Sequence, residues 1–222
     1  MASHGMAVLA LEQLEGKGQR NNKWLAAPGE NITISFIITP SPLLLKQQFL
    51  LSAVSGLACY DLFKNYTDVS CQLKWPNDLY WNDRKAGGIL IENIVRGNEW
   101  KYTIIGIGLN INQTSFPDSI RNPVSLKQIT GKHWNIVDLG KELSNCLDKQ
   151  YKRILKKQYE EILIDYNDVL YKKDLPVKLK KDGIIIDIII KGVSIEGKLL
   201  TGGDADREFN FGEMEWVTEF EV

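Results

Sequence analysis

The feature that most restricts the fold of this chain is a change of pattern near Pro176. Upstream of it, residues 137–172 show helical periodicity, which we expect to break once. Downstream, glycines separate short runs rich in β-branched residues, at residues 176–179, 184–191, 194–200 and 208–217. Closely spaced short strands with glycine turns are typical of a small β-barrel. Such a module buries little apolar surface by itself, so we expect it to pack against the rest of the chain.

The first 173 residues predict an α+β domain. Strands are expected in the β-rich runs at residues 7–12, 31–39, 69–75, 88–95 and 100–110. The last two flank the turn residues 96–99, which predict an antiparallel hairpin. Helices are expected at residues 43–64 and 137–172, with Asn135 or Asp138 as the cap of the second. We therefore predict a β-sheet with helices over residues 1–173 and a β-barrel over residues 174–222.

Composition excludes several classes of function. The 222 residues carry 27 Lys and Arg against 28 Asp and Glu, and this net charge of −1 argues against a nucleic-acid partner. Apolar runs fall far short of the roughly 18 residues that a membrane span needs, and no signal-peptide pattern opens the chain. Cys59, Cys71 and Cys146 fit neither a disulfide framework nor a zinc site. We expect reduced thiols in a cytoplasmic protein.

A basic, glycine-containing segment at residues 16–24 is the first candidate for chemistry. Its glycines let backbone N–H groups approach an anion, and Lys17, Arg20 and Lys23 add positive charge. It is not a Walker loop, because no Gly-Lys-Ser/Thr follows, and Asn21 replaces the third glycine of a dinucleotide fingerprint. The alternative interpretation is a solvated basic turn, which local pattern alone favours.

The second candidate is the run Lys-Trp-Pro-Asn-Asp-Leu at residues 74–79. Lys74 ends an apolar strand, where a buried ammonium group is costly unless it meets an anion. That anion is either Asp78, in a structural ion pair, or the carboxylate or phosphate of a ligand. In the second case Asp78 is free to hold a magnesium ion or to orient the turn.

Two further segments place glycines in strands. Lys-Ala-Gly-Gly at residues 85–88 marks a close approach of the backbone to a ligand or to another part of the chain. The run at residues 105–112 carries two glycines and then Asn110 and Asn112. If the strand continues, both amides lie on one face, where an Asn amide can read a purine edge. The alternative is a strand that ends in a turn.

Together, and in this order, the four segments resemble the biotin–protein ligase family, the biotin–[acetyl-CoA-carboxylase] ligases. Residues 12–24 are similar to its Gly-Arg-Gly-Arg-type adenylate loop, and residues 74–79 match its most specific signature. Residues 85–90 and 106–110 match the two signatures that follow, and the chain from residue 176 resembles the family's C-terminal SH3-like barrel. The resemblance covers nearly the whole chain. It implies a class II synthetase-like catalytic domain with a mixed or antiparallel sheet, followed by the barrel.

The resemblance also implies two half-reactions. Biotin, ATP and Mg²⁺ give biotinyl-5′-adenylate and pyrophosphate, and the biotinyl group then passes to a lysine of a biotin carboxyl carrier protein of acetyl-CoA carboxylase or a related carboxylase. Lys74 is implied as the catalytic residue, a fixed charge that screens the biotin carboxylate from the α-phosphate. The implied biotin-binding residues are Gln13, Gly16, Lys74 and Gly88. The implied ATP- and adenylate-binding residues are Gly16, Lys17, Gly18, Gln19, Arg20, Trp24 and Asn110.

The sequence departs from the family pattern in three ways. Gln19 stands where many members have arginine, and Asn21-Asn22 replaces a common Gly-Arg pair, which puts the grip on phosphate in question. The strand, Ser-Thr-Asn turn and helix that normally come first are not matched, since Ser-Thr-Asn occurs nowhere in this sequence. We expect either that Met1 is an internal methionine or that the chain is a natural short form. The DNA-binding winged-helix domain of the repressor-ligases is also unmatched, so we predict no operator binding.

Two other functions fit the same residues. Lipoate ligation uses the same type of fold, although residues 74–79 and the barrel favour biotin. The unmatched Ser-Thr-Asn segment motivates a non-enzymatic alternative, a catalytically impaired remnant that binds nucleotide or carrier protein without turnover. Exposed edge strands would also allow two copies of the chain to pair as a homodimer.

Overall fold

Six antiparallel strands form the main sheet of the structure, a computed structural model that describes residues 3–67, 70–203 and 205–217. The strand order is β1-β2-β6-β5-β4-β3, and every neighbouring pair is antiparallel. The long hairpin predicted around residues 96–99 is confirmed as β5 and β6. The strands are β1 (Ala7–Leu9), β2 (Ile32–Ile38), β3 (Cys71–Lys74), β4 (Asp78–Trp81), β5 (Arg84–Arg96) and β6 (Glu99–Leu109).

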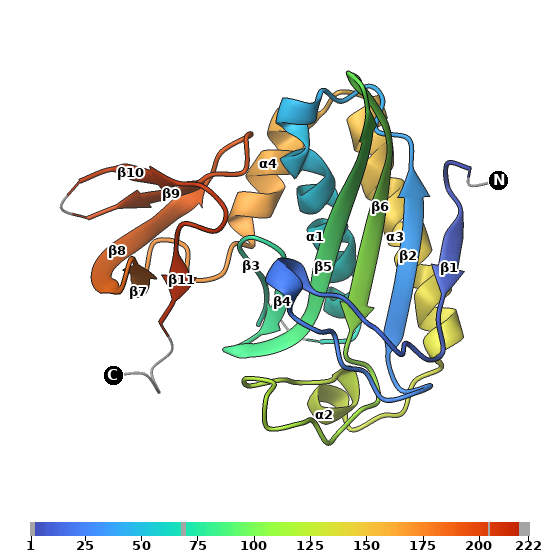
Figure 1. The fold of residues 1–222 in the computed structure, drawn as a ribbon. Coiled ribbons are helices and arrows are strands. Elements are labelled where there is room, and N and C mark those ends of the chain that lie inside the picture. Colours follow the sequence, from blue (N-terminus) through green and yellow to red (C-terminus); the bar gives the residue numbers. More distant parts are fainter. Residues whose placement is uncertain (1–2, 68–69, 204, 218–222) are drawn as a thin grey trace.

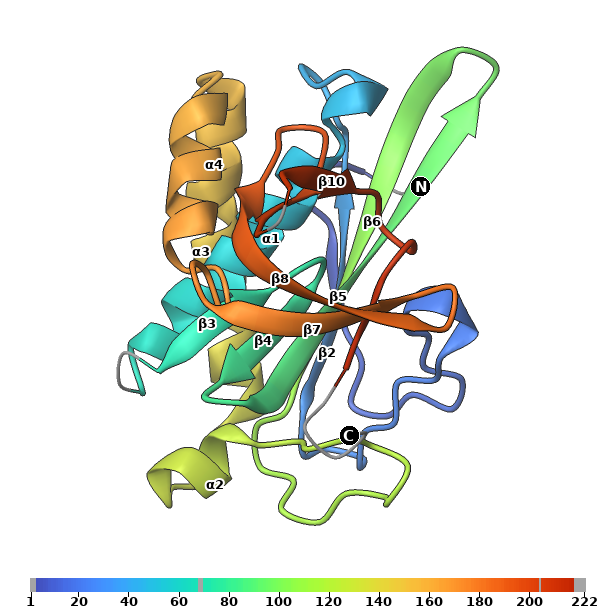
Figure 2. The same ribbon diagram turned by 90° about the vertical axis from the view of Figure 1, so that its left-hand side faces the viewer.

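Three helices cover one face of this sheet, namely α1 (Phe49–Lys64), α3 (Ile136–Leu155) and α4 (Tyr159–Asp168) (Figure 1). Because α1 packs against β3, β4, β5 and both other helices, it is apolar on nearly all sides. The expected cap of α3 is Asn135, whose side chain accepts hydrogen bonds from the N–H groups of Val137 and Asp138. Figure 2 shows the helices on one side of the sheet and the blue N-terminal segment on the other.

Several boundaries differ from the sequence prediction for local reasons. The helix predicted from residue 43 begins at Phe49, because Leu45–Gln47 forms a separate 3₁₀ turn that the Gln47 side chain closes on the Leu44 N–H. The turn predicted through Asp78 is shorter, and β4 begins at Asp78 itself, opposite Lys74. The short helix α2 (Leu126–Thr130) was not predicted, although its capping box at Ser125 is a sequence signal.

The C-terminal strands form a second, five-stranded antiparallel sheet of order β10-β9-β8-β7-β11, which we call the C-terminal sheet. The run predicted as a strand from residue 194 begins with a turn, in which the Gly197 N–H donates to the Ser194 carbonyl. The run 208–217 contains two strands. The elements are β7 (Pro176–Lys181), β8 (Ile184–Val193), β9 (Leu199–Gly202), β10 (Arg207–Phe209) and β11 (Glu215–Trp216).

The C-terminal sheet packs against the main domain through Trp75. The Trp75 Nε1 donates to the Gly197 carbonyl at 3.0 Å, and the Trp216 Nε1 donates to the Trp75 carbonyl at 3.3 Å. The expected docking of the C-terminal module is therefore confirmed. The domain division at residues 173 and 174 stays a prediction, and the predicted limits at residues 1, 69 and 222 lie outside the described residues.

The three cysteines lie within the core of the main domain or against it. Cys59 and Cys71 are buried, Cys146 is half-buried, and all three are free thiols. Burial raises the pKa of the Cys59 and Cys146 thiols, which makes them poor nucleophiles. In the described part of the chain, no helix is both long enough and apolar enough to cross a membrane.

Candidate active site

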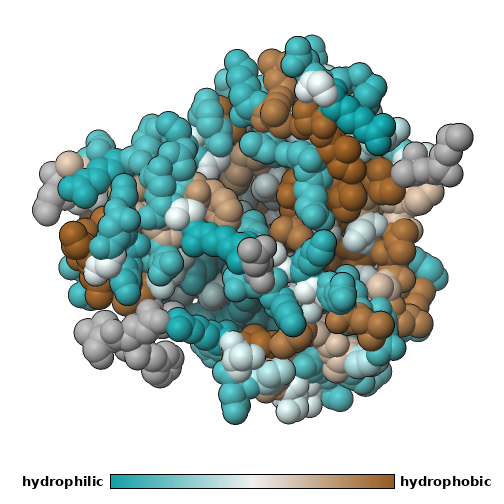
Figure 3. Space-filling view, in the orientation of Figure 1, coloured by the Kyte–Doolittle hydropathy of each residue, from teal (hydrophilic) through white to brown (hydrophobic). Residues whose placement is uncertain are grey.

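A cavity of about 710 Å³ lies over the outer face of the main sheet, opposite the helices. The basic segment 16–24 forms one wall, the turn before β4 forms a second, and residues 211–216 of the C-terminal sheet form a third. Figure 3 shows a hollow in this face with hydrophilic residues around it. The cavity therefore brings together residues from both ends of the chain, including most of the residues singled out in the sequence.

Glycines keep the floor of this cavity open. Gly88 on β5 and Gly106 on β6 line it, and a Cβ atom at either position would meet no heavy atom closer than 3.4 Å. A Cβ at Gly108 would instead lie 2.3 Å from Cε2 of Trp24, so the indole ring lies directly on this glycine. The close approach of the backbone was predicted for residues 85–88, and it is confirmed at Gly87, where a Cβ would lie 2.7 Å from the Gly108 carbonyl oxygen.

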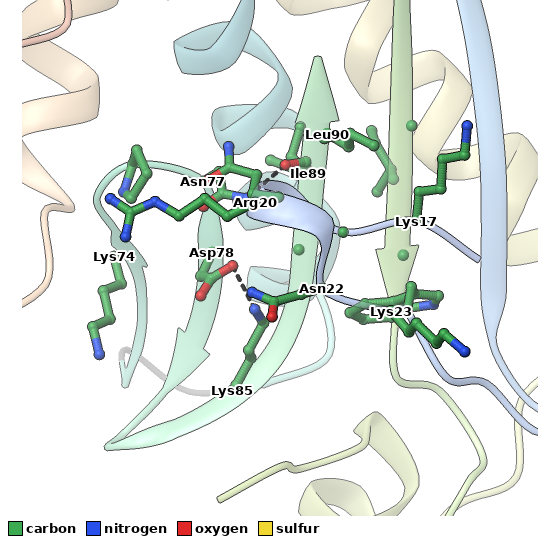
Figure 4. Close-up of a pocket in the computed structure, with 18 of the residues that line it drawn as sticks. Lys17, Arg20, Asn22, Lys23, Lys74, Asn77, Asp78, Lys85, Ile89 and Leu90 are labelled. Carbon is green, nitrogen blue, oxygen red and sulfur yellow. Dashed lines mark hydrogen bonds and ion pairs between the residues drawn. The ribbon is translucent and has the colours of Figure 1, made fainter. Parts of the chain in front are cut away.

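The central charged pair of the cavity is Lys85 with Asp78. The Lys85 Nζ lies 2.7 Å from the Asp78 Oδ1, and the side chains are only 30% and 20% exposed. The pairing of β4 with β5 brings the two side chains together. Asp78 lies opposite Gly88, Lys85 lies opposite Tyr80, and the register of the two strands shifts between Leu79 and Tyr80. Figure 4 shows both side chains on the floor of the cavity, beneath the basic segment. Sequence reasoning missed Lys85, although its place just before two glycines was a signal.

Lys74 lines the same cavity, but its amine lies among aromatic rings. The Nζ lies 4.6 Å from the ring centres of Tyr80 and Trp216 and 5.5 Å from that of Tyr171. It donates to the Tyr80 hydroxyl at 3.2 Å. Burial lowers the pKa of Lys74 to about 8, and the nearby Asp78 charge opposes that shift only in part. The ion pair considered for Lys74 with Asp78 is therefore not formed, because Lys85 takes that carboxylate.

The basic segment folds as a small hairpin of its own. The Trp24 N–H donates to the Gly16 carbonyl at 2.9 Å, and the Gly18 N–H donates to the Asn22 carbonyl at 2.7 Å. The Gly18 N–H group is therefore already hydrogen-bonded within the segment, which argues against its expected contact with phosphate. Packing explains the glycine at position 16, because a Cβ there would lie 2.3 Å from the Trp24 carbonyl oxygen. Lys17, Gly18, Gln19 and Arg20 all line the cavity.

Trp24 lines both this cavity and a second one of about 840 Å³. Both cavities are lined by Gln13 and Trp24, and the second also contains Gly16, Phe116 and Pro117. The Trp24 Nε1 is buried without a hydrogen-bond partner among the described residues. An indole donor and a proline–phenylalanine wall can enclose a flat, polar-edged ligand.

Asn110 does not line either cavity. It is 5% exposed, and its Nδ2 donates to the carbonyls of Lys85 and Val124 at 3.3 and 3.2 Å. The Asn112 amide is also hydrogen-bonded within the protein, since its side chain exchanges two hydrogen bonds with the Trp134 backbone. The strand β6 ends at Leu109, so the alternative of a strand ending in a turn is the correct one. Asn110 acts on the site by holding the backbone of Lys85.

Asp78 was the candidate magnesium ligand. Among the described residues, no group of three or more His, Cys, Asp or Glu side chains is placed to hold a metal ion. Asp78 is a single carboxylate paired with Lys85. Its role as a magnesium ligand stays a prediction, because a Mg²⁺ held by one carboxylate takes its other ligands from substrate phosphates and water.

The comparison with protein families and known proteins agrees with this geometry. Residues 2–110 match the model of the biotin/lipoate A/B protein ligase family. The bifunctional ligase/repressor BirA of Bacillus spizizenii is 30% identical over 164 residues, which is 72% of this chain and 50% of that protein. The biotin–[acetyl-CoA-carboxylase] ligase of Paracoccus denitrificans is 33% identical over 132 residues, 56% of this chain and 53% of that protein. The chain thus spans about half the length of these relatives.

A solved structure gives the same result for the fold. The biotin protein ligase from Aquifex aeolicus, in complex with biotin and ATP, matches with a TM-score of 0.82 and 27% identity. The match covers 97% of this chain and 90% of that one. The protein therefore has the mixed α+β fold with antiparallel sheets that is seen in this solved biotin protein ligase. More narrowly, residues 2–110 form a domain of the biotin/lipoate A/B protein ligase family.

Proposed function

We propose that this chain activates biotin with ATP to biotinyl-5′-adenylate and transfers the biotinyl group to a lysine of a biotin carboxyl carrier domain. The observation that carries this proposal is the partly buried Lys85–Asp78 pair on a glycine floor, beneath a basic segment. The biotin protein ligase from Aquifex aeolicus was solved in complex with biotin and ATP, which supports the choice of ligands. The relative from Paracoccus supports an acetyl-CoA carboxylase carrier as the acceptor.

The chemistry needs a positive charge where two anions meet. A biotin carboxylate oxygen attacks the α-phosphorus, the bond to the bridging oxygen breaks, and pyrophosphate leaves. Lys85 is our candidate for the screening charge, because its ammonium stands on the cavity floor and Asp78 fixes its position. Lys74, the residue implied by the family resemblance, is proposed as a second, more remote charge in the same cavity.

The remaining residues are proposed to bind and enclose the reactants. Gln13 and Gly88 line the part of the cavity that would hold biotin, while Lys17, Gln19 and Arg20 approach from the basic segment. Trp24 would lie between the acyl part and the adenine, since it lines both cavities. A closed segment would exclude water from the mixed anhydride until the carrier lysine attacks its carbonyl carbon and AMP leaves.

The test is transfer to a carrier domain, followed by mass spectrometry. The chain is incubated with ATP, biotin and a biotin carboxyl carrier domain, and lipoate replaces biotin in a parallel reaction. We expect the mass of one biotinyl group on the carrier lysine, and none on a carrier whose lysine is replaced by arginine. Modification by lipoate but not by biotin would reject biotin as the substrate.

A further inference from the structure

Arg20 reaches across the mouth of the cavity to the C-terminal sheet. Its guanidinium carbon lies 5.1 Å from the centre of the Phe211 ring. In Figure 4, Arg20 extends from the basic segment towards the Lys74 side of the cavity, whereas Lys17 and Lys23 extend to the opposite side. The contact therefore joins the N-terminal wall of the cavity to its C-terminal wall.

The turn that carries Phe211 is shaped for this contact. Gly212 has a φ of +96°, a backbone conformation that favours glycine. A Cβ at this position would lie 3.1 Å from the Arg20 Nη2, so the absence of a side chain lets the guanidinium approach the turn. The Phe211 ring and Gly212 together form a shallow surface that accommodates a planar cation. The Arg20 guanidinium is such a cation, a group that stacks on aromatic faces.

Phe211 is held in place by the main domain. Its ring meets that of Trp75 edge to face, with centroids 6.3 Å apart and an interplanar angle of 75°. Trp75 is only 3% exposed and is hydrogen-bonded to both Gly197 and Trp216. Phe211 is nevertheless 48% exposed, so core packing alone does not account for a large ring at this position.

The backbone of Arg20 needs outside support. Its φ of +54° and ψ of +42° lie in the left-handed region, which is unfavourable for a residue with a Cβ atom. The hydrogen bonds from Gly18 to Asn22 and from Asn22 to Gln19 close the turn around it. The side-chain contact with Phe211 is the one interaction that ties this strained turn to a wall across the cavity, within the described part of the chain.

We propose that Phe211 is a positioning residue, which holds Arg20 and thereby keeps the basic segment closed over the cavity between the two half-reactions. The consequence for catalysis rests on the proposed function, because an adenylate must form in the cavity before it can be retained. Phe211 touches no reacting atom, and it acts through the position of Arg20.

The first test needs no substrate. Lys17, Arg20 and Lys23 make the basic segment a trypsin target, so limited proteolysis of the native protein reports how often the segment opens. An exposed cation–π contact changes such an equilibrium by about two- to five-fold. We expect Phe211→Leu to speed cleavage within residues 17–23 by that factor, and Phe211→Tyr to restore the wild-type rate.

Ile184→Ala is the matched control, because Ile184 is an exposed apolar residue of the same sheet, 67% exposed at the β7–β8 turn. It should leave the cleavage rate unchanged. Equal cleavage of the wild type and Phe211→Leu would overturn the proposal. So would faster cleavage in Phe211→Leu and Ile184→Ala alike, since that would report a loosened C-terminal sheet instead of a lost contact with Arg20.

The second test measures retention directly, by rapid separation of free and bound biotinyl-adenylate in a single turnover. Phe211→Leu should release the adenylate about two- to five-fold faster while its rate of formation changes little. Slower formation with unchanged release would overturn the positioning role. If the wild type forms no adenylate, the proposed function fails, and the proteolysis result still decides whether Phe211 holds the segment.

Discussion

Two lysines of the main sheet, Lys74 and Lys85, line the cavity, and their surroundings differ in kind. Lys85 meets a carboxylate, which fixes its position and leaves hydrogen atoms of the ammonium group free to turn to a second anion. Lys74 meets three aromatic rings and one hydroxyl, which surround the amine and offer it no full negative charge at contact distance. A charge that must act on an incoming ligand is better placed at Lys85.

The first prediction separates the two lysines by alanine substitution. Loss of a preorganised charge at the reacting centre costs about 100-fold in rate, so we expect that loss in adenylate formation for Lys85→Ala. Lys74→Ala should cost less than about tenfold, because its amine is more remote. Adenylate formation is measured with saturating biotin and ATP, and circular dichroism checks that both variants fold. The opposite order of the two effects would return the catalytic role to Lys74.

The second prediction concerns stability and pH. Burial lowers the pKa of Lys74 from its ordinary 10.5 to about 8, so the folded state gives up this proton earlier than the unfolded state does. Between pH 8 and 10.5 the unfolded chain therefore binds more protons, and stability due to this group rises with pH. The wild type should gain about 1–3 kcal/mol relative to Lys74→Met across that window, as measured by urea unfolding. A constant difference between the two proteins would show that Lys74 has an ordinary pKa.

At the residue scale, the sequence could predict which side chains are unusual but not which partners they meet. Lys74 was predicted as a buried amine in need of a partner, yet its rings come from β4, from the segment after α4 and from β11. The family resemblance implied that Asn110 contacts adenine, and the alternation of two asparagines agreed with this only if the strand continued through Asn112. The strand ends at Leu109, and the Asn110 amide turns into the protein.

At the scale of elements, glycines in β5 and β6 make the site possible, and each has a distinct role. Gly108 makes room for the Trp24 ring, whereas Gly106 faces open space in the cavity. The sequence predicted these strands and the hairpin between them, because β-branched runs and a glycine turn are local signals. It missed β4 and merged β10 with β11, because elements of two to four residues leave little pattern to detect.

The third prediction uses these two glycines as a pair. A methyl group at Gly108 would overlap the Trp24 ring, so Gly108→Ala should displace the indole and cost about 1–3 kcal/mol in unfolding free energy. Gly106→Ala adds the same methyl group to the same strand and meets nothing closer than 3.6 Å. Its unfolding free energy should stay within about 0.5 kcal/mol of the wild type. Equal losses in the two variants, measured by urea unfolding, would mean that Trp24 does not rest on Gly108.

At the scale of the whole molecule, the cavity depends on the position of the C-terminal sheet. This sheet supplies Phe211 and Trp216 to the cavity wall, and Trp75 joins it to the segment that carries Lys74 and Asp78. The sequence predicted that the module would dock, since so small a sheet needs apolar cover. It could not predict the docking surface, because the contacts join residues more than a hundred positions apart.

The fourth prediction measures this junction with two tryptophan substitutions. Trp75→Phe removes an indole N–H that donates to the Gly197 carbonyl and leaves that carbonyl without its partner. Trp100→Phe is the control, because its Nε1 is buried without a hydrogen-bond partner among the described residues. The loss of unfolding free energy should be larger for Trp75→Phe by about 1–2 kcal/mol. Equal losses would mean that the indole–carbonyl bond contributes nothing to docking.

The proposed activation of biotin in this cavity is most directly tested by biotin-dependent exchange of labelled pyrophosphate into ATP. The reaction requires only the 222-residue chain, ATP, biotin and Mg²⁺, and it needs no carrier protein. We predict exchange that depends on biotin, is not supported by lipoate, and falls about 100-fold in Lys85→Ala. Absence of exchange in a folded protein that still binds ATP would contradict the proposal and leave a binding protein with the fold of a ligase.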